Sequence, residues 1–289
     1  MIRALVRAGR PRQWTKNVLV LAAPGAAGLL DDGDVFAAAL GVLVAFCLAS
    51  SGTYIWNDVH DRHVDTQHPT KRHRPIASGA VSVPVASLAA VVLLLAGVGL
   101  AFVVAPTAGL VVVTYVVLTT TYSLILKHVA VVDLVVIAAG FVLRAMAGAE
   151  SSDVDMSTWF ILCTSFGSLF IVTGKRYAEI REFGDGAAII RPSLASYTAS
   201  FLHTVLAMSV TATLVTYCIW AFEVRELATT TLPFYELSII PMAMALLRYL
   251  LVLEQGRGSA PEEIFAEDRS MQVLGVMWLV VFGLGVYAG

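Results

Sequence analysis

The sequence predicts an all-α protein that is embedded in a membrane and crosses it nine times. Of its 289 residues, 58% are hydrophobic and 14% are charged, and the mean hydropathy is +0.79. The apolar residues form continuous stretches of roughly 17–25 residues, the length that crosses a bilayer as a helix. The basic residues gather on alternate connections between those stretches, as in polytopic membrane proteins. We expect the whole chain, residues 1–289, to form a single transmembrane domain.

Each of the nine predicted helices corresponds to one apolar stretch. They are residues 17–32, 35–57, 83–104, 107–126, 129–149, 157–178, 198–222, 234–253 and 271–288. The first is short and is interrupted by Pro24 and Gly25. An odd number of crossings places the two ends of the chain on opposite sides of the membrane. The second and sixth spans run in the same direction and both end in charged motifs, which suggests a duplicated bundle.

The charged residues of the connections predict the orientation. The basic residues of the N-terminus and of the even-to-odd connections are Arg3, Arg7, Arg10, Arg12, Lys16, Arg62, Lys71, Arg72, Arg74, Lys127, Lys175, Arg176, Arg181, Arg191, Arg248, Arg257 and Arg269. The opposite connections hold Asp31, Asp32, Asp34, Glu150, Asp153 and Asp155, and Arg225 is the basic residue found with them. Because basic residues are retained on the cytoplasmic side, the N-terminus and every even-to-odd connection are predicted to be cytoplasmic.

Several kinds of site and partner are not indicated. The cysteines Cys47, Cys163 and Cys218 lie inside apolar stretches without paired spacing, so we expect neither a disulfide framework nor a zinc site. The six histidines show no metal-binding spacing. No convincing small-residue cleavage site follows the basic N-terminus and first span, so we expect no cleavable signal peptide. No nucleic-acid partner is expected.

An acidic motif follows the second span and is the main candidate for a metal site. If the helix runs on past Thr53, the side chains of Asn57, Asp58, Asp61 and Asp65 lie on nearly one face. Neighbouring carboxylates repel one another unless a cation neutralises them. Mg²⁺ takes oxygen ligands and leaves positions for substrate phosphates. These four residues are therefore the candidate magnesium ligands, with Asp58 and Asp61 as the first choice. The alternative is a solvated helix end that is merely rich in acid.

A basic run begins four residues after the acidic motif. It extends from Pro69 to Pro75 and includes Lys71, Arg72 and Arg74. Carboxylates for a metal ion and cations for phosphate groups at one membrane face predict a metal–diphosphate site. Lys71 and Arg74 are the candidate phosphate ligands. The alternative is that they only anchor the connection on the cytoplasmic side.

Three further residues are candidates from their positions. Lys16 lies beside Trp14 at the membrane interface, where it either holds a phosphate or extends its charge to water. Tyr54 lies one turn before Asp58 and either contacts the same ligand or belongs to the interfacial aromatic belt. Arg144 stands inside the fifth span, where an arginine usually faces a polar cavity or a partner. It either lines a cavity for a lipid phosphate or reaches Glu150, and Asp133, eleven residues earlier, shares its face.

At these motifs the chain resembles the UbiA-type membrane prenyltransferases. Asn57-Asp58-x-x-Asp61-x-x-x-Asp65 and Pro69-Thr70-Lys71-x-x-Arg74-Pro75-Ile76-x-x-Gly79 match two consecutive motifs of that family. The resemblance spans nearly the whole chain. It implies a UbiA-like helix bundle with an active-site cavity on the cytoplasmic side and a requirement for Mg²⁺. It also implies that Tyr122 and Lys127 form the substrate-binding tyrosine–lysine pair of the family, although their spacing is one residue longer here.

The chain is most similar to the decaprenyl-phosphate phosphoribosyltransferase branch of this family. The matching segments are the run from Arg10 to Val20, the turn Lys127-His128-x-Ala130-Val131-Val132, Gly167-Ser168-Leu169-Phe170 and Gly174-Lys175-Arg176-Tyr177-Ala178-Glu179. Aromatic prenyltransferases carry a second acidic motif, DxxxD, where this chain has Lys175, Arg176 and Glu179. The difference implies that Lys175 and Arg176 bind phosphate, and that the ligands carry more phosphate than one prenyl diphosphate.

The resemblance therefore implies a specific reaction. Phosphoribose passes from phosphoribosyl diphosphate to polyprenyl phosphate, such as decaprenyl phosphate, and pyrophosphate leaves, as in the synthesis of cell-wall arabinan precursors at the bacterial plasma membrane. Mg²⁺ neutralises the leaving group, and the ionised acceptor phosphate needs no protein base. Two alternatives are a prenyltransferase with a prenyl diphosphate donor and a polyprenyl-phosphate carrier without catalysis. Whether the chain forms a homo-oligomer is left open.

Overall fold

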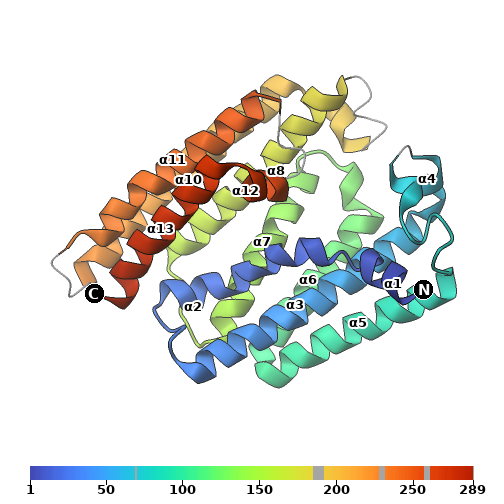
Figure 1. Ribbon diagram of the computed structural model, residues 1–289, viewed down its shortest axis with the longest axis horizontal. Helices are drawn as coiled ribbons and strands as arrows, with labels where there is room; N and C mark the ends of the chain where they lie inside the picture. Colours follow the sequence, from blue (N-terminus) through green and yellow to red (C-terminus); the bar gives the residue numbers. More distant parts are fainter. Residues whose placement is uncertain (69, 185–191, 228–231, 257–260, 289) are drawn as a thin grey trace. The chain divides into compact units, whose positions relative to one another are not determined.

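A computed structural model describes residues 1–68, 70–184, 192–227, 232–256 and 261–288 (Figure 1). Within these ranges the chain is helical and contains no strand, so the predicted all-α fold is confirmed. Pro69, Arg191 and Arg257, which belong to the basic connections predicted above, lie outside the described residues.

Eight helices of the described chain are long and apolar enough to cross a membrane. They are α3 (Gly33–His60), α5 (Val83–Val104), α6 (Pro106–Leu124), α7 (Val132–Ser151), α8 (Thr158–Phe183), α10 (Ala199–Leu227), α11 (Phe234–Glu254) and α13 (Arg269–Tyr287). Each begins and ends within a few residues of a predicted span. Continuous apolar sequence bounded by proline or polar caps explains this agreement. For example, Asp32 caps α3 by accepting hydrogen bonds from two backbone N–H groups.

The first predicted span is not one long helix, and the count of nine is not confirmed. After a short helix α1 (Ile2–Ala8), residues Pro11–Leu21 form the 3₁₀ helix η1, and Ala22–Ala26 form the short helix α2. Tight turns follow α2, where Gly28 has φ +73°. The chain therefore does not form one regular α-helix over residues 17–32. A ninth crossing remains a prediction.

Short helices lie on the connections, and one of them changes the acidic motif. They are α4 (Arg62–Gln67), η2 (Lys71–His73), η3 (Leu126–His128), η5 (Pro192–Ser196) and α12 (Pro261–Glu267). The expectation that one unbroken helix carries the whole motif is wrong, because α3 ends at His60 and α4 begins after Asp61. The hydrogen bonds from Asp61 N to Asn57 O (2.8 Å) and from Asp65 N to Asp61 O (2.9 Å) nevertheless keep helical spacing across the break.

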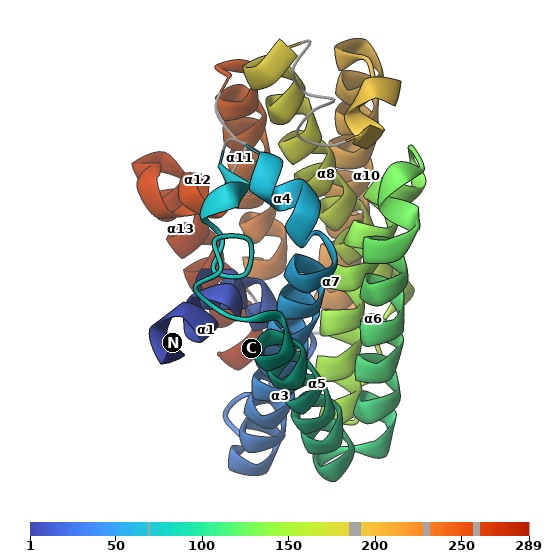
Figure 2. The same cartoon turned by 90° about the vertical axis from the view of Figure 1, so that its right-hand side faces the viewer.

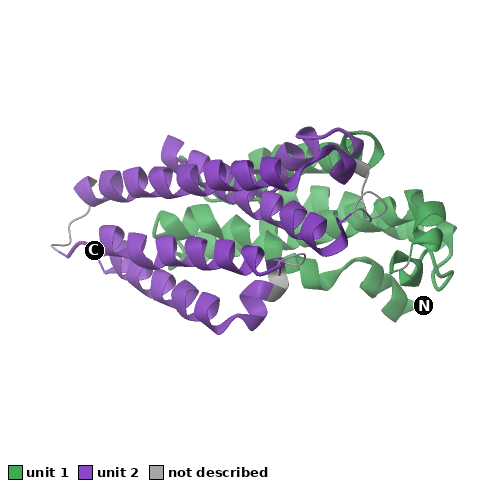
Figure 3. Cartoon of the chain, turned by 90° about the horizontal axis from the view of Figure 1, so that it is seen from above, with its two compact units in different colours: residues 1–127, 143–155 green, residues 128–142, 156–289 purple. Residues whose placement is uncertain are grey.

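The chain divides into two compact units (Figure 3). Unit 1 contains residues 1–127 and 143–155, and unit 2 contains residues 128–142 and 156–289. Helix α7 contributes its first half to unit 2 and its second half to unit 1. The expectation of a single domain over residues 1–289 stays a prediction.

In unit 1, helices α3 and α5 pack along each other (Figure 2). Gly97 of α5 allows this close approach, since a Cβ atom there would lie 2.7 Å from the backbone of Ala45 and of Ala49. Side chains of η1, α3, α5, α6 and α7 fill the core, among them Val20, Val42, Phe46, Val112 and Tyr115. Close packing of α3 fixes the direction in which its C-terminal acidic end points.

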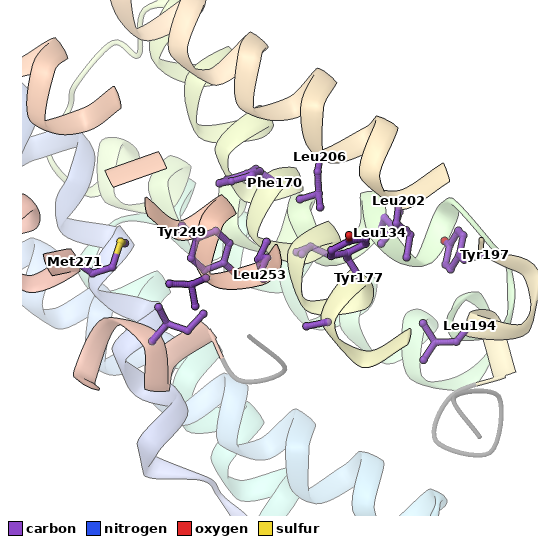
Figure 4. Close-up of a cluster of buried hydrophobic side chains, with 14 residues drawn as sticks. Leu134, Phe170, Tyr177, Leu194, Tyr197, Leu202, Leu206, Tyr249, Leu253 and Met271 are labelled. Carbon is purple, nitrogen blue, oxygen red and sulfur yellow. The ribbon is translucent and has the colours of Figure 1, made fainter. Parts of the chain in front are cut away.

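In unit 2, the core joins α8 to α10, α11 and the start of α7 (Figure 4). Its large side chains include Leu134, Phe170, Tyr177, Leu206, Tyr249 and Leu253. A Cβ atom at Gly174 would lie 2.8 Å from the side chain of Leu253 and 3.1 Å from that of Tyr249. The glycine that precedes Lys175 and Arg176 therefore leaves room for these two side chains of α11 against α8.

Candidate active site

The acidic and basic motifs of unit 1 meet at the C-terminal end of α3. The carboxylates of Asp58 and Asp65 are buried, at 1% and 3% exposure. Both accept hydrogen bonds from one nitrogen of Arg74, whose Nη1 lies 3.0 Å from Asp58 Oδ1 and 2.8 Å from Asp65 Oδ2. The two motifs that the sequence places in succession are thus brought into direct contact.

A second arginine contacts the same aspartate. Nη2 of Arg10 lies 2.5 Å from Asp58 Oδ1, and its guanidinium lies over the ring of Tyr54, 4.9 Å from the centroid. Arg10 adopts the left-handed conformation (φ 54°), which ends α1 and begins η1. Arg10 was not predicted as a site residue. The run that begins with Arg10-Pro11-Arg12 was recognised as a family segment, but its contact with Asp58 was not predicted.

The third aspartate of the motif has a different partner. Nζ of Lys127, in η3, lies 2.8 Å from Asp61 Oδ1. In unit 1, Arg10, Arg74 and Lys127 thus contact the three carboxylates of the motif. These cationic side chains are between 20% and 29% exposed. The predicted Lys127 therefore lies at the acidic motif. Asn57, near the end of α3, and Tyr122, near the end of α6, are both half-buried.

The carboxylate oxygens of the acidic motif are the kind of ligand that Mg²⁺ prefers. In this structure, arginine and lysine side chains neutralise them. No group of three or more His, Cys, Asp or Glu side chains placed to hold a metal ion occurs in the ranges that the structure describes. However, the buried oxygens of Asp58 and Asp65 converge on a single nitrogen of Arg74. A hard divalent cation prefers such oxygen ligands. Asp58 and Asp65 are the residues that could share a metal ion if Arg74 moved aside.

His68 organises the start of the basic run. Its Nδ1 accepts hydrogen bonds from the backbone N–H groups of Thr70 (3.2 Å) and Lys71 (3.3 Å). Burial, together with the neighbouring charge of Lys71, lowers the pKa of His68 below its usual value. A neutral imidazole can accept these bonds, so His68 fixes the half-buried Lys71 and the turn before Arg74. Only the position of the histidine next to the basic run could have indicated this role from the sequence.

Arg144 lies in a buried polar cluster of unit 1. Its side chain donates from Nε to Asn17 Oδ1 at 2.8 Å and from Nη2 to the hydroxyl of Tyr115 at 3.1 Å. The guanidinium also lies over the rings of Tyr115 and Phe46, 4.7 and 5.6 Å from their centroids. Arg144 is 5% exposed. Its predicted neighbour Asp133 belongs to the other unit.

In unit 2, the motif after Gly174 separates into a buried and a half-buried cation. Arg176 is 2% exposed and contacts two carboxylates, Asp133 (Nε to Oδ2, 3.4 Å) and Glu179 (Nη1 to Oε2, 3.0 Å). Asp133 also accepts hydrogen bonds from Ser193 and from the hydroxyl of Tyr197. Lys175 is half-buried. Burial and the neighbouring Asp133 raise the pKa of Tyr197, so this hydroxyl stays protonated and donates.

Comparison with known proteins places this architecture in a family. The model of the UbiA prenyltransferase family matches residues 18–283. The chain belongs to the UbiA prenyltransferase family. With the eight long apolar helices of its described residues, it is a multi-pass membrane protein of that family.

Two relatives within the UbiA family match nearly the full chain. The decaprenyl-phosphate phosphoribosyltransferase of Corynebacterium glutamicum is 40% identical over 288 residues, which cover 98% of this chain and 86% of that protein. The decaprenyl-phosphate phosphoribosyltransferase of Mycobacterium tuberculosis (strain H37Rv) is 40% identical over 293 residues, which cover 100% of this chain and 96% of that protein. The narrower similarity inferred from the sequence is therefore confirmed.

Solved structures show that the UbiA fold is shared. A UbiA homolog from Archaeoglobus fulgidus bound to GPP and Mg²⁺ aligns with a TM-score of 0.73 and 17% identity, covering 99% of this chain and 100% of that chain. A digeranylgeranylglyceryl phosphate synthase aligns with a TM-score of 0.68 and 14% identity, covering 100% and 99%. At these identities the likeness concerns the fold alone.

Proposed function

We propose that this chain transfers 5-phosphoribose from phosphoribosyl diphosphate to a polyprenyl phosphate, decaprenyl phosphate in the first instance, with release of pyrophosphate. The observation that carries the proposal is the 40% identity to proteins named decaprenyl-phosphate phosphoribosyltransferase over 98–100% of this chain. The chain is accordingly an enzyme of the bacterial plasma membrane. Its N-terminus and its charged connections face the cytoplasm, where the positive-inside rule places them.

The acidic motif of unit 1 is proposed to bind the diphosphate of the donor. Arg10, Arg74 and Lys127 are partly exposed; Arg10 and Lys127 each contact one carboxylate of the motif, and Arg74 contacts two through one nitrogen. Such side chains can exchange a carboxylate partner for a phosphate oxygen, because both are anionic acceptors of similar geometry. Mg²⁺ held by Asp58, Asp61 and Asp65, with Asn57, would supply positive charge that stabilises the leaving diphosphate. Lys71, positioned by His68, is a further phosphate ligand.

The bond changes need no protein nucleophile or base. An ionised oxygen of the acceptor phosphate forms a bond to C1 of the ribose, while the bond from C1 to the diphosphate breaks and its electron pair leaves with pyrophosphate. The protein contributes by holding the two anions close together and by placing cations where charge develops. This chemistry accords with a site whose residues are carboxylates, arginines and lysines.

The unit 2 motif is proposed to bind a phosphate through Lys175. In unit 1, Tyr122 and Lys16 are proposed as additional substrate contacts. Lys175 is the half-buried cation of the unit 2 motif, whereas Arg176 lies among carboxylates. A prenyltransferase that uses DxxxD for a second metal ion would need acid at this place. The sequence has cations there instead, which favours the phosphoribosyl reaction over a prenyl diphosphate donor. A carrier without catalysis is less favoured, since the charged motifs lie on the connections at the helix ends.

The proposal is tested by direct transfer. Purified protein in lipid nanodiscs is incubated with radiolabelled phosphoribosyl diphosphate and decaprenyl phosphate, with Mg²⁺ or with EDTA, and the label in the lipid extract is measured. We expect labelled lipid with Mg²⁺, none with EDTA, and none with protein in which Asp58 is replaced by asparagine. Labelled lipid from a prenyl diphosphate donor, with none from phosphoribosyl diphosphate, would identify a prenyltransferase. Exchange of polyprenyl phosphate without transfer would identify a carrier.

A further inference from the structure

The 3₁₀ helix η1 is held in place by tertiary contacts rather than by its own geometry. It extends over 11 residues, Pro11–Leu21. Runs of 3₁₀ helix longer than three or four residues are uncommon, because their hydrogen bonds are poorly aligned. The surroundings of η1 in unit 1 must therefore favour this conformation. Arg10, which precedes it, contacts Asp58 of the acidic motif, so the position of η1 determines the position of this arginine.

Two polar side chains attach η1 to α3. Trp14 donates from its indole Nε1 to Ser51 Oγ at 3.0 Å, and that hydroxyl donates to the carbonyl of Gly9 at 2.9 Å. Asn17, at 0% exposure, donates from Nδ2 towards Cys47 Sγ at 3.2 Å and Ser50 Oγ at 3.4 Å.

The second half of α7 also contacts η1. Arg144 donates from Nε to the side-chain oxygen of Asn17 at 2.8 Å. One turn later, a Cβ atom at Gly148 would lie 1.8 Å from the carbonyl oxygen of Val20. The backbones of α7 and η1 therefore touch at Gly148, and Arg144 binds η1 at Asn17 next to this contact. Asn17 is the residue through which α3, η1 and α7 are connected.

We propose that Arg144 and Asn17 are positioning residues, which fix η1 and thereby hold Arg10 against Asp58. This inference rests on the proposed function for its kinetic consequences. Nε and Nη2 of Arg144 bind two separate elements, η1 through Asn17 and α6 through Tyr115. The planar guanidinium provides these two donors in a fixed geometry, which the single ammonium group of a lysine does not. Arg144 thus acts through Asn17 and does not itself contact a substrate phosphate.

Kinetics of four variants distinguish positioning from direct binding. Arg144→Met, Asn17→Leu and Arg10→Gln should each raise the KM for phosphoribosyl diphosphate about tenfold, the typical effect of losing a hydrogen bond to a charged group. The KM for decaprenyl phosphate should stay within about twofold. The double variant Asn17→Leu/Arg144→Met should show about the same tenfold effect, because the two residues form one connection. Separate effects would multiply to about a hundredfold.

Arg144→Lys supplies the matched control for charge. If Arg144 positions η1, lysine keeps the charge but loses one of the two bonds, so the variant should resemble Arg144→Met. If Arg144 bound the acceptor phosphate directly, lysine would restore much of the activity, the KM for decaprenyl phosphate would rise in Arg144→Met, and Asn17→Leu would have little effect. That pattern would overturn the proposal.

A native cysteine reports on η1 independently of activity. Cys47 is 6% exposed and contacts Asn17, whereas Cys163 and Cys218 lie in unit 2 and serve as internal references. N-ethylmaleimide labelling of the substrate-free protein, followed by peptide mass spectrometry, gives the labelling rate of each thiol. We expect Cys47 to be labelled at least about tenfold faster in Asn17→Leu and Arg144→Met, which release η1, and unchanged in Arg10→Gln. Unchanged labelling of Cys47 in both release variants would overturn the proposal, even if the transfer reaction is confirmed.

Discussion

The two charged clusters of this protein both pair buried aspartates with arginines, but the arginines differ in exposure. In unit 1, Asp58 contacts Arg10 and Arg74, whose side chains are 29% and 25% exposed. In unit 2, Asp133 contacts Arg176, and the two side chains are 0% and 2% exposed. An arginine that reaches its aspartate from a half-exposed position can release it for a ligand. A fully buried pair cannot, because separation would leave charges without compensation in an apolar interior.

The comparison assigns different tasks to the two clusters. Under the proposed function, the unit 1 cluster is the binding site, and its cations contact carboxylates until phosphate binds. The unit 2 cluster is a scaffold that joins α7, α8 and η5 through Asp133, Arg176 and Ser193. On this account Lys175 is the residue of the unit 2 motif proposed to bind a phosphate, and Arg176 supports the helix that carries it.

The largest expected effect is on stability and comes from breaking the buried pair. Asp133→Asn removes the negative charge beside Arg176 while keeping the size of the side chain, and should destabilise the protein by about 3 kcal/mol. Asp61→Asn is the matched control, because Asp61 and Lys127 are both about one-fifth exposed. Its expected cost is below about 1 kcal/mol. Thermal unfolding in detergent compares the two variants. Equal losses of stability in the two variants would show that the exposure of the ion pairs does not distinguish the two clusters.

The next effect is on turnover. Asp58→Asn should lower kcat by about a hundredfold or more, because the diphosphate leaving group loses metal-mediated stabilisation. Its melting temperature should change less than that of Asp133→Asn. The measurement is a titration of transfer activity against Mg²⁺ in Asp58→Asn and Asp133→Asn. Near-normal turnover of the Asp58 variant at every Mg²⁺ concentration would remove the acidic motif from the reaction.

Substitutions of Lys175 should have smaller effects on activity, and the order of those effects distinguishes the two reactions. Lys175→Ala should raise the KM for a phosphorylated substrate about tenfold, since an attraction is lost. Lys175→Asp should be worse than Lys175→Ala, because a carboxylate then faces a phosphate. Steady-state kinetics with both substrates give the order. An aspartate variant that gained activity with a prenyl diphosphate donor would support the prenyltransferase alternative instead.

Much of the fold followed from sequence because membrane-spanning helices are locally determined. The helix predicted over residues 83–104 is α5, and it ends at the same residues. The prediction of one helix over residues 17–32 failed, because the structure of this region depends on contacts with α3 and α7, such as that between Gly148 and Val20. Apolar composition does not distinguish a 3₁₀ helix held by tertiary contacts from a regular span.

The sequence indicated most residues of the unit 1 cluster, but not Arg10 and not the long-range pairings. The spacing of Asp58, Asp61 and Asp65 identified the motif, and its succession by Arg74 located the cluster. The contacts of Asp58 with Arg10 and of Asp61 with Lys127 join residues 48 and 66 positions apart. A single sequence contains no periodicity at such distances. Likewise, the chain position of Asp133 gave no indication that Arg176 would be its partner.

The smallest effect concerns a charged contact in unit 2 outside both clusters. Asp268 caps α13 through Met271 N and accepts a hydrogen bond from Arg248 Nη2 at 2.7 Å. That bond lowers the pKa of Asp268, so the stabilisation is present above the unfolded-state pKa of about 4 and is lost as the pH falls through the folded-state pKa. Asp268→Asn should melt slightly lower than wild type at pH 7, and the gap should close in acid. A gap independent of pH would contradict this.

The most direct test of the central comparison is donor binding to one variant from each cluster. Titration calorimetry with phosphoribosyl diphosphate and Mg²⁺ would compare wild type, Arg74→Gln and Glu179→Gln, the last of which removes a carboxylate partner of Arg176. We predict that Arg74→Gln weakens binding at least about tenfold, as expected for a charged contact. Glu179→Gln should leave the Kd within about twofold while lowering the melting temperature. If Glu179→Gln weakened binding as much as Arg74→Gln, or if Arg74→Gln bound normally, the division into a binding cluster and a scaffold would be wrong.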